Sequence, residues 1–397
     1  MNIGETPLSQ YAKIQEVECI PISEKSIENG EAFALALIQL SKAIRNAVPG
    51  MVLAGVLMKS ERLEKLSSEG FFPMIPNEEG VACIRLDIFL GNQGFLEETL
   101  GLVDLIVSKP SDFMIDIDST DNRSFKFTDD FRLFYETASR LQIKELDSVK
   151  EMDVVFDRRL MCQRMDIICK ALRHKHAMPI RAPAWKYIDS YENVTRRGQG
   201  IDWKIGIDIE FPCIIKPRLG CGPSKAHQMA LVFRSDGFDE TEVPSPGIIQ
   251  EYINHGGMIW KIYVAGSDIF YERRKSTPDI KMQDIVDEDT PSCIEFDSLR
   301  SLPSAFPWAR STSSSAIKHR KESQNILTED FISRMAIAVK EHIKLNLFGF
   351  DVAFDHRAGE AVIVDINYFP SFGKTEGAST AFLSVLRSAC QQTDKDV

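Results

Sequence analysis

The sequence of 397 residues carries 47 Lys and Arg against 58 Asp and Glu, a formal net charge of −11, and 44% of its residues are hydrophobic. Single hydrophobic cores stop growing at roughly 250 to 300 residues, so this length predicts two or three domains. The acidic balance argues against a protein built to coat nucleic acid or anionic lipid. Any anion site must therefore come from a local cluster of basic residues.

The cysteines and the amino terminus indicate the cellular compartment. The eight cysteines are scattered without a C-x-x-C pair, a pattern typical of reduced, mostly buried thiols. The first residues lack the basic and then apolar pattern of a secretion signal. The longest uncharged stretch, Ala47 to Met58, is interrupted by Pro49 and Gly50 and is too short to span a bilayer. We expect a cytoplasmic protein that could also enter the nucleus and that does not contact a membrane.

The first third of the chain predicts a small α/β domain. Residues 1–50 include an apolar helix-like run from Phe33 to Ile44 and are expected to pack on or flank the first domain. Within 51–150, the strand-like runs MVLAGVLM, VACIRLDIFL and VDLIVSKP alternate with helical or loop segments. The last segment, FRLFYETASRLQ, has apolar residues at helical spacing: Phe131, Phe134, Ala138 and Leu141. This alternation is typical of a parallel sheet.

A central domain is predicted over 151–256. A helix should begin after Asp157, a good N-cap residue. Five apolar side chains of this helix should point inward: Leu160, Met161, Met165, Ile168 and Leu172. The strands FPCIIKP, MALVF and GIIQEYI follow, and the glycine-rich segment LGCGPS between the first two is expected to act as a lid.

The last domain is predicted over 257–397. It opens with two strands, MIWKIYVAG and DIFYERRK, joined near Gly266. Residues 278–327 are rich in Pro, Asp, Ser and Thr and predict a long flexible loop. The helix FISRMAIAVKEHIKL, the strands LFGFDVAFD and AVIVDINYF, and a helix near Thr380 to Cys390 complete the chain.

Three oxygen ligands gather on the predicted hairpin near the carboxyl end. Asp365 and Asn367 lie two apart on one strand, so their side chains share a face. Asp351 lies on the partner strand. If the hairpin brings the three together, they form the partial set of hard ligands that Mg²⁺ prefers when phosphate and water fill the rest. From spacing alone, ordinary carboxylates at strand ends explain the pattern equally well.

Two other segments concentrate positive charge. The stretch 211–234 holds Lys216, His227 and further basic residues without one Asp or Glu, and its glycines would let a backbone approach phosphate. It is no Walker loop, and a tight hairpin with a solvated Lys is the competing interpretation. In INHGGMIWKIYVAG followed by YERRKS, Lys261 stands among apolar residues on a strand, so an anionic substrate is expected to supply its partner. An ordinary strand with one exposed face is the alternative.

These segments together resemble the inositol 1,3,4-trisphosphate 5/6-kinase family, also called inositol tetrakisphosphate 1-kinases, which have the ATP-grasp fold. The strings FPCIIKP, SKAHQMALVF, QEYINHGGMIWKIYVAG, RRKSTPD, LFGFDVAFD and DINYFPSF occur in the family's order and approximate spacing. The similarity is clearest from Asp157 to Cys390 and continues back to about Met51. It implies an α/β first domain and two further α/β domains that clasp ATP.

The resemblance also implies roles for single residues. For ATP it implies these contacts: Arg158, Lys216, Gln250, Glu251, Ile253, Ser276 and Ser298. For the inositol phosphate it implies a second set: Arg62, Lys109, His227, Lys261, Arg274, Asn367 and Ser371. Lys216, Lys261 and His227 are the implied catalytic residues, and Asp351, Asp365 and Asn367 the implied ligands of Mg²⁺, with two ions expected.

The chain departs from the family pattern around the substrate. Cys221 stands where relatives often have His or Asp, Gly222-Pro223 replaces Gly-Thr, Ser371 replaces a Gly, and Arg62 replaces a Lys. These changes put the choice of inositol phosphate in doubt more than the kinase activity.

The expected function is transfer of the ATP γ-phosphoryl group to a hydroxyl of a soluble inositol tris- or tetrakisphosphate, in line and with Mg²⁺. Two alternatives remain: an ATP-grasp ligase acting on a carboxylate, and an inactive inositol phosphate sensor. The expected partners are ATP and the inositol polyphosphate, without membrane or nucleic acid. The resemblance further implies a monomer.

Overall fold

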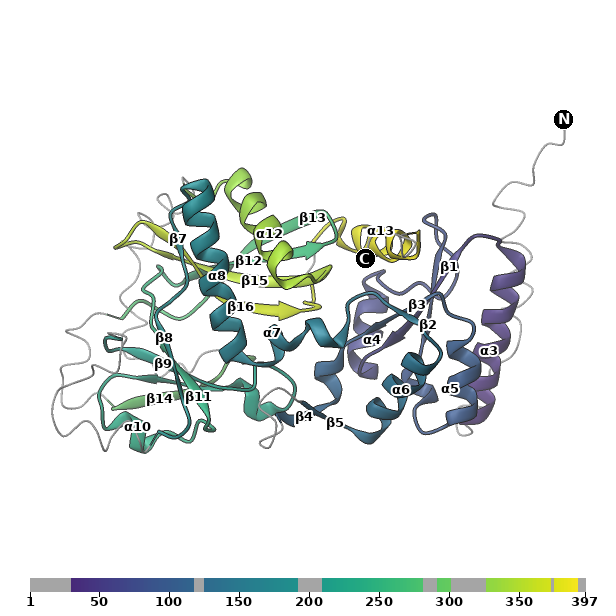
Figure 1. Ribbon diagram of the computed structural model, residues 1–397, viewed down its shortest axis with the longest axis horizontal. Coiled ribbons are helices and arrows are strands. Elements are labelled where there is room, and N and C mark those ends of the chain that lie inside the picture. Colours follow the sequence, from purple (N-terminus) through teal and green to yellow (C-terminus); the bar gives the residue numbers. More distant parts are fainter. Residues whose placement is uncertain are drawn as a thin grey trace. The chain divides into compact units, whose positions relative to one another are not determined.

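The computed structural model describes residues 30–117, 125–191, 209–280, 291–300, 326–372 and 375–391. The chain divides into two compact units. The first consists of Met1–Ile115, Lys126–Ser148 and Ser371–Val397, and the second of Asp116–Phe125 and Val149–Pro370. Figure 1 labels their elements along the chain. Two short paired strands, β4 (Met114–Ile117) and β5 (Phe125–Phe127), contain points at which the chain passes from one unit to the other.

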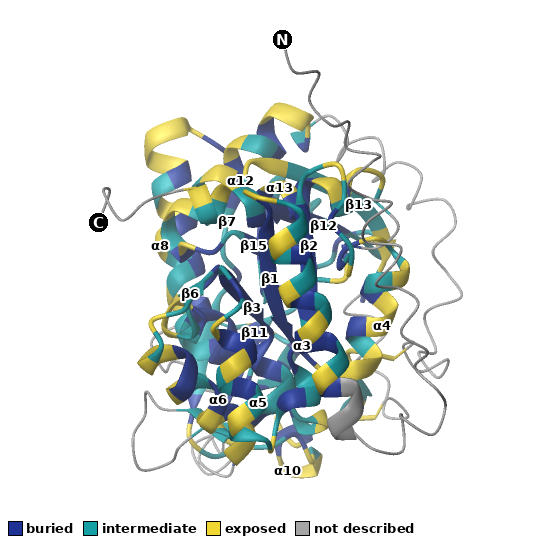
Figure 2. Ribbon diagram, turned by 90° about the vertical axis from the view of Figure 1, so that its right-hand side faces the viewer, coloured by how far each residue is buried: buried dark blue, intermediate teal, exposed yellow. Residues whose placement is uncertain are grey.

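The first unit contains a four-stranded sheet in the order β2-β1-β3-β6. All three strand pairs are parallel, which confirms the expected parallel sheet. The strands are β1 (Val52–Leu57), β2 (Val81–Arg85), β3 (Leu105–Ser108) and β6 (Lys144–Glu145). The helices are α3 (Gly30–Ala47), α4 (Ser60–Ser68), α5 (Gln93–Leu100), α6 (Asp129–Arg140) and α13 (Ala378–Gln391), with short 3₁₀ turns at Asp87–Phe89 and Pro110–Phe113. Figure 2 shows β1 buried, whereas α3 presents both buried and exposed positions.

The carboxyl-terminal helix α13 belongs to this first unit. Phe71 lies against Phe372 and Phe382, with ring centroids 5.5 and 5.6 Å apart, and Phe72 meets Phe382 edge-on. The domain expected over 257–397 is therefore divided, because an aromatic cluster holds residues after 370 to the first sheet.

The second unit contains two five-stranded sheets. One has the order β14-β10-β9-β11-β8, and all its pairs are antiparallel. Its strands are β8 (Trp185–Ile188), β9 (Cys213–Pro217), β10 (Gln228–Val232), β11 (Gly247–Glu251) and β14 (Cys293–Asp297). The other has the order β13-β12-β15-β16-β7, antiparallel except for β16 with β7. Its strands are β7 (Ile180–Arg181), β12 (Met258–Ala265), β13 (Asp268–Lys275), β15 (Leu347–Asp355) and β16 (Glu360–Tyr368).

Helix α8 (Arg158–His176) packs against α12 (Glu329–Ile343), β11 and β16, and therefore touches both sheets (Figure 1). Asp157 caps α8 by accepting a hydrogen bond from the backbone N–H of Arg159, as predicted. Short helices in the described part of this unit include α7 (Asp153–Phe156) and α10 (Gly237–Glu240), with 3₁₀ turns at Val149–Glu151 and Ser224–His227.

The structure corrects several details of the sequence analysis. Leu141 and Leu160 are only half-buried, whereas Cys162 and Cys169 join the buried face of α8. The segment expected as one flexible loop, 278–327, includes strand β14, which pairs with β10. Its stretches 281–290 and 301–325 lie outside the described residues.

The described cysteines agree with the expectation of free thiols. Seven are described and all are free; Cys83, Cys162, Cys169 and Cys213 are buried. In the parts of the chain that the structure describes, no helix combines the length and apolar character needed to span a membrane.

Candidate active site

A cavity of about 620 Å³ lies in the second unit and is lined by residues of both its sheets. Nine residues assigned to the nucleotide, the substrate or the metal from the sequence line it: Lys216, Gln250, Glu251, Ile253, Lys261, Ser276, Ser298, Asp351 and Asp365. Six of these nine residues lie on five strands, β9, β11, β12, β15 and β16, and the nine are up to about 150 positions apart in the chain.

The first sheet supplies an apolar wall and one cation. Along β9, Cys213 and Ile215 point into the core beside Val232, whereas Ile214 and Lys216 alternate with them and face the cavity. Lys216 Nζ lies 3.3 Å from the carbonyl oxygen of Val364. Burial lowers the pKa of Lys216, while the nearby carboxylate of Asp365 opposes that shift.

The second sheet carries a registered row of charges across four strands. Lys261 pairs across the strands with Glu272 and Asp351, and Asp351 pairs in turn with Asp365. Lys261 Nζ lies 2.6 Å from Asp351 Oδ2. The partner that the sequence analysis expected from a substrate is thus provided by Asp351. Asn367 Nδ2 donates a hydrogen bond of 3.0 Å to Asp365 Oδ2.

A β-bulge shapes the floor of the cavity. The pairing of β15 with β16 moves from Asp351 opposite Asp365 to Val352 opposite Ile363, which leaves Val364 as an extra residue. In a regular strand Val364 and Asp365 would face opposite sides, but here both line the cavity. The bulge also leaves the Val364 carbonyl available to Lys216.

The paired carboxylates suit a cation. Burial raises the pKa of Asp351, and the neighbouring charge of Asp365 acts in the same direction, so an added positive charge would relieve the pair. Among the described residues, no group of three His, Cys, Asp or Glu side chains is arranged to hold a metal ion. Asp351, Asp365 and the Asn367 amide are all hard oxygen donors, and they fit Mg²⁺ if phosphate oxygens and water complete its shell.

Arg158 anchors the glycine-rich segment. Its guanidinium donates to the carbonyl oxygens of Pro217 at 2.8 Å, Leu219 at 2.7 Å and Ala226 at 3.0 Å. Gly220 N donates to Phe156 O at 2.7 Å. The predicted lid is therefore tied to the start of α8 at its first residues. Arg158 does not line the cavity, and its contact with ATP stays a prediction.

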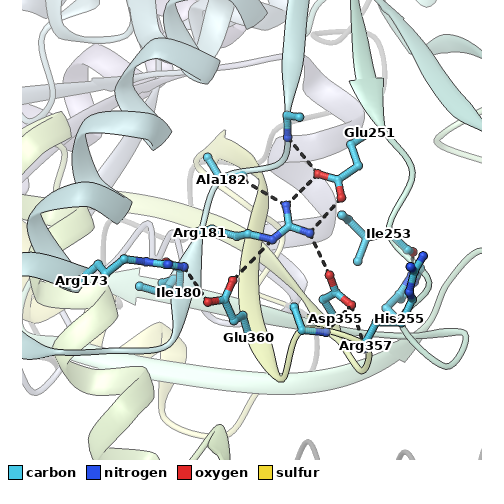
Figure 3. A network of polar contacts seen from close by, with 12 residues as sticks. Arg173, Ile180, Arg181, Ala182, Glu251, Ile253, His255, Asp355, Arg357 and Glu360 are labelled. Carbon is cyan, nitrogen blue, oxygen red and sulfur yellow. Dashed lines mark hydrogen bonds and ion pairs between the residues drawn. The ribbon is translucent and has the colours of Figure 1, made fainter. Parts of the chain in front are cut away.

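Glu251 is held by Arg181. The guanidinium of Arg181 donates to both carboxylate oxygens of Glu251 at 2.7 and 2.9 Å and to Asp355 at 2.8 Å (Figure 3). Glu251 also accepts from Ala184 N. The Glu251 carboxylate is therefore already paired, and its predicted contact with ATP would have to come from its backbone. Because Glu251 ends β11 and Asp355 ends β15, Arg181 links the two sheets.

Three residues assigned to the substrate lie in the second unit without lining the cavity: His227, Arg274 and Asn367. His227 Nδ1 lies 3.4 Å from Ser298 Oγ. Burial and the nearby charge of Arg158 lower the pKa of His227. Arg274 forms an ion pair with Glu272 at 2.6 Å.

The other three assigned residues belong to the first unit. Arg62 on α4 forms an ion pair with Asp112 at 3.2 Å. Lys109 is buried just after β3, and Ser371 is exposed. Their roles at the inositol phosphate stay predictions.

The sequence analysis missed further residues that line the cavity. Apolar walls come from Ile214, Met229, Ile259 and Phe296, and polar contributions from His255, Lys275, Thr277 and Arg300. Strand alternation around Lys216 and Lys261 could have located Ile214 and Ile259. Phe296 was hidden because its strand was taken for a loop. His255 lies in the segment INHGGMIWKIYVAG, which was singled out for its positive charge, but burial lowers the pKa of this histidine.

Comparison with known proteins assigns the fold of this unit. Residues 200–388 match the family model described as the inositol 1,3,4-trisphosphate 5/6-kinase ATP-grasp domain. Over these residues the chain is similar to the ATP-grasp domain of this family. The family includes kinases, and an ATP-grasp kinase implies ATP as its co-substrate.

Curated relatives of the family match different lengths of the chain. Inositol-tetrakisphosphate 1-kinase 6 of Oryza sativa subsp. indica is 30% identical over 343 residues, which are 85% of this chain and 60% of that protein. Inositol-tetrakisphosphate 1-kinase 5 of Oryza sativa subsp. japonica is 33% identical over 173 residues, 43% of this chain and 49% of that protein. The chain thus spans between half and three fifths of these relatives.

Among solved structures, a RimK domain ATP-grasp protein from Sphaerobacter thermophilus aligns with a TM-score of 0.46 at 10% identity, covering 86% of this chain and 100% of that one. The family model carries the fold assignment.

Proposed function

We propose that the protein binds ATP in the cavity of the second unit and transfers its γ-phosphoryl group to a hydroxyl of a soluble inositol tris- or tetrakisphosphate. The observation that carries the proposal is the meeting of Lys216 with Asp351 and Asp365 inside a cavity that also has an apolar wall. The match to the family model and the similarity to the curated relative support the same activity. We also expect the protein to be a cytoplasmic monomer that acts without a membrane or nucleic acid.

The cavity offers a separate environment to each part of ATP. The adenine would lie against Ile214, Met229 and Phe296, beside the backbone of 250–253. The phosphates would extend toward Lys216, whose ammonium is already directed to the bulge at Val364. Ser276 and Ser298 line the same space and would donate hydroxyl hydrogen bonds.

Asp351, Asp365 and Asn367 would hold Mg²⁺, with two ions expected. When bound, the metal would neutralise charge on the β- and γ-phosphates. Lys261 already forms an ion pair with Asp351, so it would be shared between this carboxylate and the phosphates. Phosphoryl transfer then depends on alignment and on fixed positive charge more than on covalent chemistry by the protein.

The inositol phosphate needs several donors, and the candidates differ in character. Lys261 and Arg274 bring positive charge, and Asn367 brings an amide. His227 has a lowered pKa and would be neutral near pH 7, so it would act by hydrogen bonding. For Arg62, Lys109 and Ser371, the contact with the inositol phosphate is proposed from the sequence resemblance.

The test is an assay of phosphate transfer. Purified protein would be incubated with γ-labelled ATP, Mg²⁺ and a panel of inositol tris- and tetrakisphosphates, and products separated by chromatography. We expect label on at least one inositol, and loss of that label in Asp365→Asn. Asp268→Asn is the matched control, because Asp268 is exposed at the far end of β13 in the same sheet; it should keep wild-type activity.

Other results would identify the alternatives. ATP binding with phosphate released only in the presence of a carboxylate and an amine would indicate a ligase. Binding of inositol phosphate without any turnover would indicate a sensor. Activity unchanged in Asp365→Asn would contradict the proposed site.

A further inference from the structure

His255 lines the cavity and carries a buried ring nitrogen without a hydrogen-bond partner among the described residues. The side chain is 6% exposed and lines the cavity. Its Nε2 atom has no hydrogen-bond partner among the residues that the structure describes. Buried polar atoms are nearly always paired, so an unpaired nitrogen in a residue that lines a binding cavity points to a ligand atom.

The other ring nitrogen fixes what this ligand atom must be. His255 Nδ1 lies 2.6 Å from the carbonyl oxygen of Ile253. A carbonyl oxygen only accepts, so Nδ1 carries the hydrogen and Nε2 carries the lone pair of a neutral imidazole. Burial, which lowers the pKa of His255, keeps the ring neutral, although the backbone contact and the charge of Asp279 act in the opposite direction. Nε2 therefore accepts a hydrogen bond and cannot pair with a phosphate oxygen.

The backbone around His255 is held in place from both sides. Asn254 Nδ2 donates to Ile280 O at 2.8 Å, and Ile280 N donates to Asn254 Oδ1 at 2.9 Å. Gly256 N donates to Asp279 Oδ1 at 2.7 Å, and Ser276 N donates to Gly257 O at 2.9 Å. The imidazole is thus fixed before any ligand arrives.

We propose that His255 Nε2 accepts a hydrogen bond from the nucleoside part of the bound nucleotide. Two groups of ATP have the required chemistry, the exocyclic amine of adenine and a ribose hydroxyl. The inference rests on the proposed function, because it takes the nucleotide to occupy this cavity. His255 follows directly on residues 250–253, beside which the nucleoside would lie, so it selects the nucleoside and takes no part in the transfer.

The experiment measures nucleotide affinity alone, by calorimetry without any inositol phosphate. His255→Phe keeps a ring and removes the acceptor, and should weaken ATP binding about tenfold. His255→Gln, whose carbonyl reaches toward the position of Nε2, should recover part of the loss. The control is His342→Phe: His342 Nδ1 also contacts a backbone carbonyl, that of Ala338 at 2.7 Å, but the residue does not line the cavity.

Three ATP analogues identify the donor: purine riboside triphosphate, which lacks the amine, 2′-deoxyATP and 3′-deoxyATP. We expect one of them to bind the wild type about tenfold more weakly than ATP, and to lose nothing further in His255→Phe. Equal binding of all four nucleotides by the wild type would overturn the inference even if no variant folds. The inference would also be overturned if each analogue lost the same affinity relative to ATP in the wild type and in His255→Phe. His255 would then affect nucleotide binding only by supporting the local structure. Failure of the wild type to bind any nucleotide would instead contradict the proposed function.

Discussion

At the scale of the residue, strand alternation singled out the main charged groups but left their role open. Lys216, Asp351 and Asp365 line one cavity, whereas spacing alone explained them equally well as ordinary strand-end or solvated charges. The partner of Lys261 could not be predicted, because Asp351 lies 90 residues away and strand register between distant segments is absent from the local pattern. The same holds for Glu251, whose partner Arg181 is 70 positions earlier.

Lys216 provides the first prediction. Lys216→Met removes the ammonium beside Asp365 and the phosphate site, and should lower the rate of ATP turnover by roughly 10²- to 10³-fold. Steady-state kinetics would measure the loss. Lys170→Met is the control, because Lys170 is exposed on α8 of the same unit. Equal rates of ATP turnover for wild type and Lys216→Met would contradict the proposed role of Lys216 at the phosphates.

At the scale of the element, the sequence predicted strands where apolar runs were long and failed where they were short. β14 was missed because five residues with an internal Glu stand among Pro, Ser and Asp, and only pairing with β10 makes them a strand. The bulge at Val364 likewise depends on the partner strand. The glycine-rich segment was located correctly, but its attachment to α8 through Arg158 needs tertiary contacts.

Arg181 joins the ends of β11 and β15, and its removal should loosen the two sheets. Arg181→Gln leaves the carboxylates of Glu251 and Asp355 facing each other without a cation, and should cost roughly 2 kcal/mol, between the values typical of surface and buried pairs. Denaturant unfolding would measure it. Arg173→Gln removes the more exposed ion pair with Glu360 and should cost less than about 1 kcal/mol. Equal effects would show that Arg181 has no special role.

The effect of Arg181→Gln should depend on pH. Burial alone would raise the pKa of Asp355, but hydrogen bonds from Arg181 and from the backbone N–H groups of Ala358 and Arg357 outweigh it and hold the pKa below its usual value. A lowered pKa contributes stability above the unfolded value of about 3.9, and that stability is lost as the pH falls through the folded value. The difference between wild type and variant should therefore be full at pH 7 and shrink below about pH 4.

Gly220 tests the attachment of the glycine-rich segment. A Cβ at this position would lie 2.6 Å from Val155 O and 3.2 Å from Phe156 O. Gly220→Ala should therefore push the segment away from α8 and cost roughly 2 kcal/mol. Gly94→Ala is the control, because a Cβ there would lie at ordinary van der Waals distance from its neighbour. Gly94 is also part of α5, and Ala favours a helix more than Gly does. A stable, fully active Gly220→Ala protein would contradict the anchoring.

At the scale of the whole molecule, the sequence predicted the α/β class and a parallel first sheet, whereas the described chain divides into two compact units rather than the three domains expected. The boundary near residue 150 was recognised because the composition changes there and a helix begins shortly afterwards. The assignment of α13 to the first unit could not be predicted, because it rests on aromatic contacts between Phe71, Phe372 and Phe382, about 300 positions apart.

Hydrogen exchange would test the predicted contacts of Arg62 and Lys109 with the substrate. ATP alone should protect amides of the second unit around Lys216, Gln250 and Asp351. Adding an inositol phosphate should extend protection to α4 around Arg62 and to the turn at Lys109. If protection stayed confined to the second unit with ATP alone and with ATP plus inositol phosphate, the predicted roles of Arg62 and Lys109 at the substrate would be wrong.

The central claim is that this chain itself phosphorylates an inositol phosphate, and a single-turnover measurement tests it most directly. Enzyme in excess of γ-labelled ATP would be mixed with inositol 1,3,4-trisphosphate or inositol 3,4,5,6-tetrakisphosphate and quenched over time. We expect label to move to the inositol in an amount that matches the enzyme's bound ATP, and Asp365→Asn to abolish the transfer. Label that remains on ATP or appears only as free phosphate, with both substrates bound, would contradict it.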